Sequence, residues 1–373
     1  NFGVVAFKNS GRTEELHGIF QQHGLDIIEQ FEDRALLIPR KVLLDYSPEA
    51  RIFPQLKAQE EVEILEKIVS HPPIREEIDD GWFAQPYREL DRTNDADRFV
   101  EDESEGDYPV FGGSNIYQFS HDPTFVDINP PEFWSVEETL DPDRSAKRRI
   151  REKSVRTLKS ELYEAFDGTG SQVSFVDELL TDHRGEGLSE DDVLLDCTEH
   201  RIVFRDITKF TNERTIVAAV IPPDVVCTNT LHTIRPYHID PDEDDLDTTP
   251  LHSVYERVCS DESLFAALGL INSVPFDYLM RTKIDTHIVM YKFEGSQVPR
   301  LTGGDEWFEH IWTRAAKLNC YGDRFVEMRD SLGIEAATTD SERRRIQAEL
   351  DAGAFHAYGL TREQTKFILD DFY

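Results

Sequence analysis

The chain has 373 residues, which is enough for two or three domains that each bury a core. Its 40 basic and 74 acidic residues give a formal net charge of −34, and only 12 of the basic residues are lysine. This composition predicts a protein adapted to high salt, where a large negative charge keeps it dissolved. An acidic disordered chain is excluded because runs of Val, Ile, Leu and Phe recur throughout.

Signals for a membrane or an oxidising compartment are not found in the sequence. No apolar run reaches the length of a membrane span, and no charged-then-apolar leader opens the chain. The four cysteines lie tens of residues apart without a CxxC pair, so they predict neither a zinc site nor a disulfide framework. We therefore expect a reduced, cytoplasmic protein without a membrane partner.

The first predicted unit, residues 1–95, is a small α/β segment. A strand is expected over Gly3–Lys8. Apolar residues at helical spacing predict a helix over Ala58–Ser70, which a pair of prolines ends. An acidic, turn-rich stretch over Asp91–Asp107 then leads into the next segment.

Residues 96–300 are predicted to form a mixed sheet with helices, and residues 301–373 a helical tail. A long helix is expected to run on from a basic stretch to about Phe166, followed by strands over Arg201–Ile207 and Arg214–Ile221. A helix over Glu262–Arg281 and a strand over Ile284–Phe293 come next. The predicted fold class is α+β, with the mixed sheet flanked by the N-terminal α/β segment and the helical C-terminal tail.

Catalytic signatures are weak. "DINPPEFW", Asp127–Trp134, contains the Asn-Pro-Pro that adenine-N6 methyltransferases place before an aromatic residue to hold a flipped base. Here Glu132 takes the aromatic position and no glycine-rich loop precedes the motif, so a rigid turn is predicted. Carboxylates at Asp242–Asp245 lack the following lysine of a metal-dependent nuclease. The sequence also lacks GxSxG and GxxxxGK[ST], and no metal site is assigned.

Positive charge is concentrated in "RSAKRRIREKSVRTLK", Arg144–Lys159, which carries eight basic residues and one acidic residue. At about 1 M salt the Debye length is only about 3 Å, so distant acidic faces are screened and local charge decides binding. A helix here can straddle a phosphate backbone or enter the major groove. The alternative is a solvated face that pairs with the protein's own acids.

A polar hinge joins the two β-branched runs of "HRIVFRDITKFTNERTIVAAVIPP", His200–Pro223. Its arginines and Asn212 can donate to phosphates or base edges. A second interpretation also stays open, a buried network in which Arg205 pairs with Asp206 and Glu213 with Arg214. Tyr117 has the same two interpretations, since an aromatic ring either stacks on a base or belongs to the core.

Five sequence blocks follow one another in order. The first two are "YPVFGGSNIYQFSHD" and "PPEFWSVEE", and the third is the hinge. The last two are "LGLINSVPFDYLMRTKIDTHIVMYKFEGSQVP" and "ERRRIQAELDAGAFHAYGLTREQTKFILDDF". As an ordered set they resemble the C-terminal region of type IIG restriction-modification enzymes and of related adenine methyltransferases in BREX and DISARM phage-defence systems.

The resemblance implies sequence-specific DNA recognition. In that family the methyltransferase domain, which binds S-adenosylmethionine, lies N-terminal to these blocks, and the C-terminal region holds DNA and reads its sequence. The chain is then expected to be a non-catalytic part without its own cofactor. Its partners would be double-stranded DNA and the methyltransferase domain of the same chain. The residues expected to contact DNA are Tyr117, Arg148, Arg149, Arg151, Lys153, Arg201, Arg205, Asn212, Arg214 and Lys283.

The sequence departs from the family pattern at two places. Asn115 stands where the family has lysine, and Asp122-Pro123 replaces its arginine, so neither position is expected to contact phosphate. Two other functions stay open: a module that docks another protein of a phage-defence complex, and a divergent Mg²⁺-dependent nuclease that uses Asp242–Asp245.

Overall fold

The computed structural model describes residues 11–20, 29–48, 51–78, 81–135, 146–209, 211–284, 286–370 and 372. At its centre lies an antiparallel sheet in the order β3-β10-β7-β8. The β-branched runs on either side of the hinge become two of these strands, as expected for side chains that pack well on a pleated surface. The strands are β3 (Pro86–Tyr87), β7 (Arg201–Arg205), β8 (Ala218–Ile221) and β10 (Leu231–Ile234).

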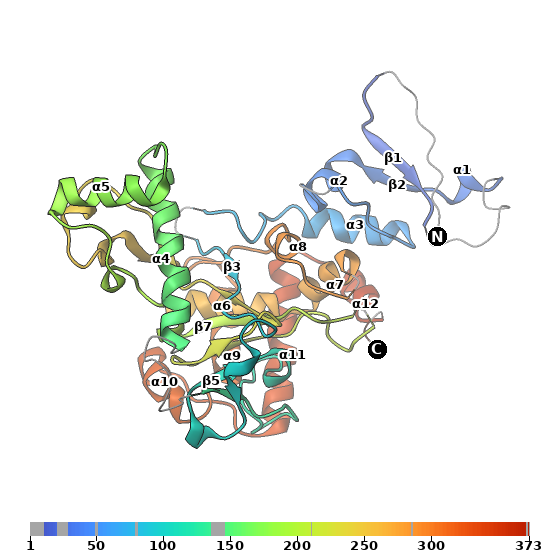
Figure 1. Cartoon of the computed structure of the whole chain (residues 1–373). Helices are drawn as coiled ribbons and strands as arrows, with labels where there is room; N and C mark the ends of the chain where they lie inside the picture. Colours follow the sequence, from blue (N-terminus) through green and yellow to red (C-terminus); the bar gives the residue numbers. More distant parts are fainter. Residues whose placement is uncertain are drawn as a thin grey trace.

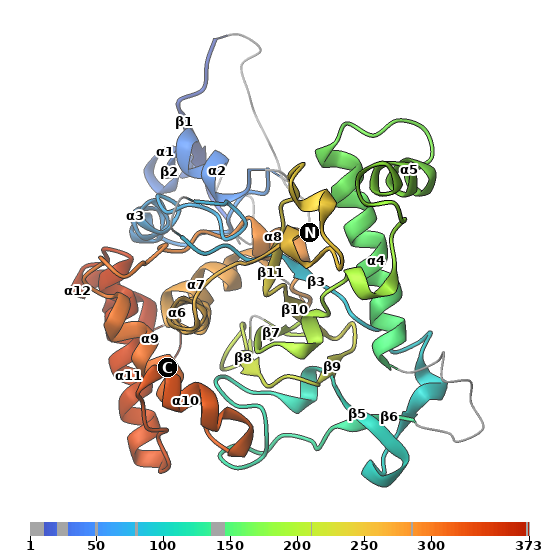
Figure 2. The same cartoon turned by 90° about the vertical axis from the view of Figure 1, so that its left-hand side faces the viewer.

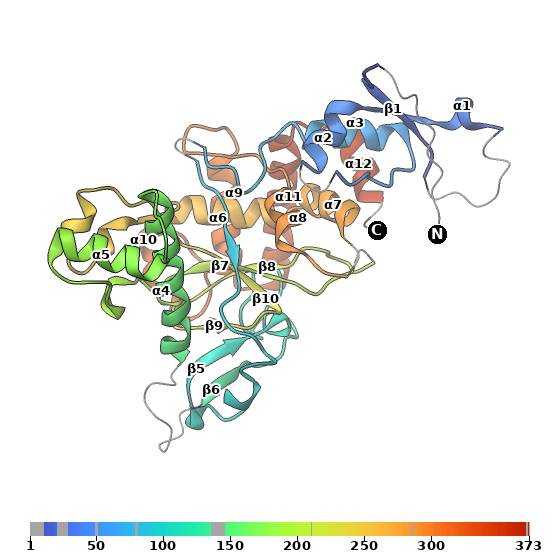
Figure 3. The same cartoon turned by 45° about the horizontal axis from the view of Figure 1, so that its top comes forward.

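Both faces of the central sheet are buried. Ile202 and Phe204 of β7 belong to the main hydrophobic core, whereas Val203 between them belongs to a separate cluster on the other face. This alternation follows from the two-residue period of a strand. Figure 3 shows the helices on one side of β7, β8 and β10, and β5 and β6 on the other.

A layer of helices covers the first face (Figure 2). The closest packing joins α6 to α9, where a Cβ at Gly269 would lie only 2.7 Å from Ile311 Cγ2. Only glycine therefore lets these two helices approach so closely. The helices are α6 (Asp261–Ile271), α7 (Val274–Lys283), α8 (Met290–Glu294), α9 (Phe308–Asn319), α10 (Val326–Leu332), α11 (Asp340–Ala357) and α12 (Arg362–Asp370).

A second sheet, in the order β4-β6-β5-β9, is mixed because β5 and β9 pair in parallel. It shares a hydrophobic cluster with a lobe built around α4 and α5, which stand at the left of Figure 1. The strands are β4 (Phe99–Val100), β5 (Gly106–Phe111), β6 (Glu132–Ser135) and β9 (Val226–Cys227). The lobe contains α4 (Ala146–Ala165), α5 (Gln172–Arg184), β11 (Tyr237–Ile239) and β12 (Tyr255–Arg257).

The N-terminal segment packs onto the helical layer rather than forming a core of its own. The Tyr46 hydroxyl donates to the Thr282 carbonyl oxygen at 2.8 Å, and Lys67 Nζ donates to that of Gly359 at 2.9 Å. The segment contains β1 (Glu15–Gly18), α1 (Phe31–Arg34), β2 (Leu36–Pro39), α2 (Arg40–Tyr46) and α3 (Gln59–Ile68). It lies at the upper right of Figure 1.

The α+β class and the long basic helix are confirmed, but three element predictions need correction. The expected helix over 262–281 is two helices, α6 and α7. They are separated at Asn272, whose side chain bonds to β8, and Pro275 lies in the first turn of α7. Strand β8 begins only at Ala218. The expected strand over 284–293 is wrong, since its second half forms α8. The strand predicted at Gly3–Lys8 lies outside the described residues.

One hydrophobic cluster extends from Leu36 to Ile368 and includes residues of the N-terminal segment, the central sheet and the C-terminal helices. The division of the chain at residues 95 and 300 stays a prediction, but the main core is continuous across both positions. Within the described ranges no single helix is long and apolar enough to cross a bilayer. Helices α6 and α7 meet that test only as a pair bent by 57°.

An ion pair without exposed surface joins the two sheets. Arg201 Nη2 donates to Glu89 Oε1 and to the Val225 carbonyl oxygen, both at 2.7 Å. The other carboxylate oxygen of Glu89 accepts from the Cys227 N–H at 2.6 Å. Tyr87 donates its hydroxyl to Glu89 at 2.9 Å. Removing either ion would leave the other charged and buried.

We expect Arg201→Met to lower the free energy of unfolding by about 3–5 kcal/mol, because Glu89 loses its buried counter-charge. Urea denaturation at constant salt measures this loss. The control is Arg257→Met, whose ion pair with Asp261 lies at the surface and is worth at most about 1 kcal/mol. Glu89→Met combined with Arg201→Met should recover much of the stability; a single variant as stable as the wild type would contradict the role of the pair.

The edge of the central sheet is completed by side-chain amides. Asn272 accepts from the Ala218 N–H at 3.0 Å and donates to the Ala218 carbonyl oxygen at 2.9 Å. Asn319 does the same for Val220, at 2.9 Å in both directions. These two amides occupy backbone groups of β8 that face away from β7, where the Ala218 carbonyl oxygen also accepts from the Phe119 N–H at 3.0 Å. Buried backbone groups at a sheet edge need such partners.

Asn319→Ala should lower the free energy of unfolding by about 2–4 kcal/mol, because the buried N–H and carbonyl of Val220 both lose a partner. Thermal and urea denaturation measure the loss. Asn94→Ala is the matched control, since Asn94 is exposed and its side chain has no such contact with β8. Equal stability of the two variants would show that water replaces the Asn319 amide.

Candidate nucleic-acid interface

Helix α4 presents its basic residues from the outer lobe. Ile150, Leu158 and Leu162 are buried in the lobe's hydrophobic cluster, and their spacing places them along one stripe of the helix. Arg156 lies off this stripe and is exposed. The helix therefore has one apolar face that attaches it and other faces available for a partner.

The four α4 residues predicted to contact DNA divide into two pairs. Arg151 lies 3.6 Å from the Glu190 carboxylate, and Lys153 donates to the Glu89 carbonyl oxygen at the base of the lobe. These two side chains therefore have contacts within the protein. Arg148 and Arg149 belong to α4, but their side chains lie outside the part of the structure that is described.

The hinge, which is the segment between the end of β7 at Arg205 and the start of β8 at Ala218, is fixed by side chains of helix α7. Both oxygens of Asp277, a residue without exposed surface, accept from the Thr215 N–H at 3.0 and 3.1 Å. Arg281, one turn later, donates to the carbonyl oxygens of Asn212 and Glu213 at 3.0 and 2.6 Å. The hinge is thus fixed by two α7 side chains that sequence reasoning did not select.

Arg214 is part of this support. Its guanidinium lies 3.4 Å from Asp351 and 4.0 Å from Asp277. Burial raises the pKa of Asp277, and the charges of Arg214 and Arg281 oppose that rise. Arg214 therefore belongs to a buried polar network, as one interpretation predicted. Its acid partners are Asp277 and Asp351, however, and not the expected Glu213. The side chain of Arg214 is 11% exposed.

Arg205 and Tyr117 are half-buried, and Asn212 is exposed in the hinge. Arg205 donates to the Ile116 carbonyl oxygen, and its guanidinium carbon lies 5.7 Å from the centre of the Tyr117 ring. Burial lowers the pKa of Arg205, and no acid forms a salt bridge with it among the described residues. Asn212 is exposed, with Nδ2 3.5 Å from Thr208 Oγ1. The structure therefore brings Arg205 and Tyr117 together, and Asn212 lies in the hinge that follows β7.

Two predicted contact residues are buried instead. Arg201 has no exposed surface because it forms the ion pair with Glu89. Lys283 is 8% exposed, and its Nζ donates to the Gly295 carbonyl oxygen at 3.1 Å and to Ser296 Oγ at 3.2 Å. Arg201 therefore has no surface from which to reach a duplex. The described hydrogen bonds of Lys283 all lie within the protein, where it lines a hollow. Their sequence context could not show this, because it depends on distant residues.

The Asn-Pro-Pro turn is held by an unexpected residue. Asn115, which stands where the family has lysine, donates from Nδ2 to the carbonyl oxygens of Asn129 and Pro130 at 3.1 and 2.9 Å. The prolyl carbonyl, which accepts from a target base in the catalytic motif, therefore has a partner within the protein. This contact agrees with the predicted rigid turn.

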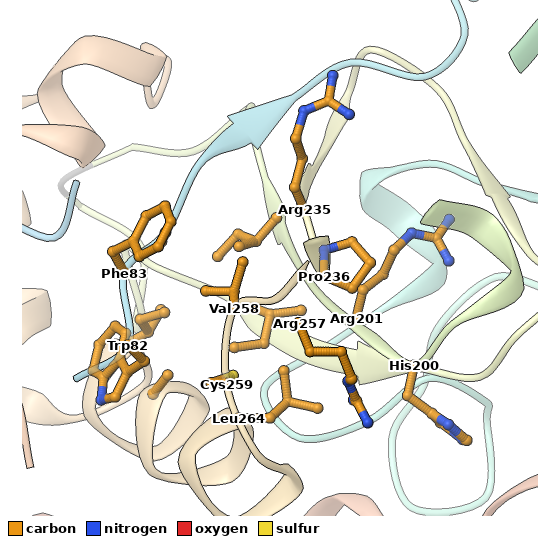
Figure 4. Close-up of a pocket in the computed structure, with 15 residues that line it drawn as sticks. Trp82, Phe83, His200, Arg201, Arg235, Pro236, Arg257, Val258, Cys259 and Leu264 are labelled. Carbon is orange, nitrogen blue, oxygen red and sulfur yellow. The ribbon is translucent and has the colours of Figure 1, made fainter. Parts of the chain in front are cut away.

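The hollow beside the central sheet offers little polar chemistry. Figure 4 shows a pocket of about 450 Å³, part of it open to solvent, between the Trp82–Ala84 stretch, the central sheet and α6. Its walls are mostly apolar, and the guanidinium groups of Arg201 and Arg235 point away from it. No group of three or more His, Cys, Asp or Glu residues suited to a metal occurs among the residues described. Asp242 and Asp245 instead accept hydrogen bonds from each other's N–H at 3.0 Å.

Comparison with solved structures adds a distant likeness. The sequence matches no family model and no curated protein. Among solved structures, the chain is similar to the type IIL restriction-modification enzyme MmeI, which was solved in complex with DNA. The identity is 11% and the TM-score 0.38, over 81% of this chain and 36% of MmeI. A likeness this distant does not establish a shared function.

The buried Lys283 makes stability depend on pH. Burial lowers its pKa to about 7, and the nearby charge of Lys292 adds to this effect. The unfolded chain, with a lysine pKa of about 10.4, then binds more protons than the folded chain between pH 7 and 10. The free energy of unfolding should therefore rise with pH in this window, by up to about 1.4 kcal/mol per pH unit from this group.

We expect Lys283→Met to remove this rise and to be more stable than the wild type at pH 7, because no charge is then buried. Chemical denaturation at pH 7, 8 and 9 measures the slope. Lys366→Met, at an exposed position on α12, is the control and should keep the wild-type slope. Parallel slopes for all three proteins would show that Lys283 keeps an ordinary pKa.

Proposed function

We propose that this chain recognises double-stranded DNA and that α4 contacts the phosphate backbone. The supporting observation is local. In a protein of net charge −34, this one helix carries seven basic and three acidic residues. Its attachment uses an apolar stripe together with Lys153, whereas Arg156 lies off the stripe and is exposed. Lys and Arg that neutralise phosphates supply most of the affinity for DNA regardless of sequence.

Base recognition is assigned to the hinge surface, which we define as Tyr117, Arg205 and Asn212. Arginine and asparagine can bond bidentately to guanine and adenine, and a tyrosine ring can stack on an exposed base. Asp277 and Arg281 fix the hinge backbone, so these donors are held in place before DNA arrives. A rigid scaffold of this kind favours specific recognition because little conformational entropy is lost on binding.

In the whole enzyme, this chain selects the sequence for an adenine-N6 methyltransferase domain N-terminal to it in the same polypeptide. That domain binds S-adenosylmethionine and supplies the methyl transfer, with cleavage as a possible second activity of the fused enzyme. The five ordered sequence blocks support this assignment. A flipped adenine costs a few kcal/mol of stacking and pairing, which the DNA contacts of the recognition part offset. Cytoplasmic phage defence in a salt-adapted cell is the proposed setting.

One surface feature favours a second candidate, a module that docks another protein of a defence complex. Ile207 is 58% exposed, and Val289 and Tyr291 are about 40% exposed. Ile207 pairs with His287 in an isolated bridge, and Val289 and Tyr291 follow His287 in the chain. Exposed apolar side chains that gather on one surface are typical of protein interfaces. This candidate predicts a protein partner and no footprint on DNA.

Selection from a pool of random duplexes in about 1 M KCl separates the two candidates. An enriched motif that contains an adenine would support target recognition and would give the site. A protein that retains no duplex at any salt concentration would contradict the DNA proposal and favour docking.

We expect Arg149→Glu combined with Arg156→Glu to weaken binding to all duplexes by about tenfold or more, because phosphate contacts carry no sequence information. The slope of log K against log salt should decrease by about one per lost contact. Gel shift or fluorescence anisotropy across a salt series measures both. Arg344→Glu, an exposed reversal on α11, is the control. Unchanged affinity in the double variant would show that α4 is only a solvated face.

A further inference from the structure

A second hollow lies between the end of α2 and the short helix α8. It measures about 350 Å³, including the part open to solvent. Lys283, the last residue of α7, lines it, and so do Ser47, Pro48 and Ile52, which follow α2. The described residues that line it are Tyr46, Ser47, Pro48, Ile52, Lys283, Tyr291, Lys292 and Gly295.

The lining has an unusual charge for this protein. Two of the 12 lysines line the hollow, while none of its described lining residues is acidic in a chain that has 74 acidic residues. Lys292 Nζ lies 2.6 Å from the Lys283 carbonyl oxygen, and its charge adds to burial in lowering the pKa of Lys283. A site that gathers like charges is destabilised until an opposite charge enters it.

The hydrogen-bond partners of the two ammonium groups are neutral. Lys283 Nζ donates to the Gly295 carbonyl oxygen and to Ser296 Oγ, and it lies 4.9 Å from the centre of the Tyr46 ring. Lys292 Nζ donates to the Lys283 carbonyl oxygen at 2.6 Å. Carbonyl and hydroxyl oxygens solvate a cation without neutralising it, and each ammonium group has three protons to donate. The hollow is therefore electropositive in its described part.

We propose that this hollow binds a tetrahedral oxyanion of the phosphate class, held by Lys283 and Lys292, with the Ser47 hydroxyl as a further donor. Such an anion offers several acceptor oxygens to donors that converge from different elements, and charge-assisted bonds to it are strong. The occupant is a phosphate group, whether free in solution or part of a nucleic acid. The site is separate from the hinge surface and from α4, so it does not depend on the proposed DNA function.

Thermal unfolding in inorganic phosphate, with KCl adjusted to constant ionic strength, tests the site in the absence of DNA. Saturating phosphate should raise the Tm of the wild type by about 1–3 °C, as expected for a ligand that binds only the folded state. Lys292→Met and Lys283→Met should each lose the shift. The second variant is expected to fold at least as well as the wild type, so a loss there cannot be blamed on unfolding.

Lys366→Met is the control and should keep the phosphate shift. A shift of equal size in Lys292→Met, or an equal shift with KCl alone, would overturn the proposal.

Duplex binding then identifies the source of the phosphate group. If Lys292→Met also weakens duplex binding and phosphate competes with DNA, the occupant is a nucleic-acid phosphate; an unchanged duplex affinity assigns the site to free phosphate. Failure of the α4 variants to affect DNA binding would leave the phosphate result standing.

Discussion

Arg201 and Glu89 lie out of reach of water at the place where the two sheets meet, and the surrounding structure is arranged to satisfy them. Glu89 accepts from the backbone of β9 and from the Tyr87 hydroxyl, while Arg201 also reaches the Val225 carbonyl. The backbone carbonyl of Glu89 receives Lys153 of α4. Because a buried ion is tolerated only when its partners are in place, the pair fixes the central sheet, the second sheet and the lobe relative to one another.

The same principle sets the hinge and the sheet edge. Asn272 and Asn319 complete β8, and Asp277 and Arg281 complete the backbone of the hinge. Each of these side chains comes from the helical layer and ends on a strand or a loop. The surface that carries Arg205 and Asn212 is therefore positioned by the interior and not by the hinge's own sequence. This explains how a loop of exposed polar residues can keep one conformation.

Periodicity and local charge were enough to predict the α+β class and the basic helix α4, because both depend on residues close in sequence. The same signals failed at residues 284–293, where β-branched and aromatic residues suggested a strand but tertiary contacts favour α8. They also failed for Arg201 and Lys283. Their partners, Glu89 and Ser296, are brought to them by the fold and are not neighbours in the sequence. The spacing of Asp277 and Arg281 is that of a helical ion pair, so the pair could have been found, although its contact with the hinge could not.

The continuous main core limits how parts of this chain can be exchanged between proteins. Helix α9 lies beyond residue 300, yet it packs on α6 through Gly269 and completes β8 through Asn319. A graft that ended near residue 300 would carry the sheet without the helix that seals its edge, and would expose both Ile311's contact surface and the backbone of Val220. A recombined chain would therefore have to keep the C-terminal helices together with the central sheet.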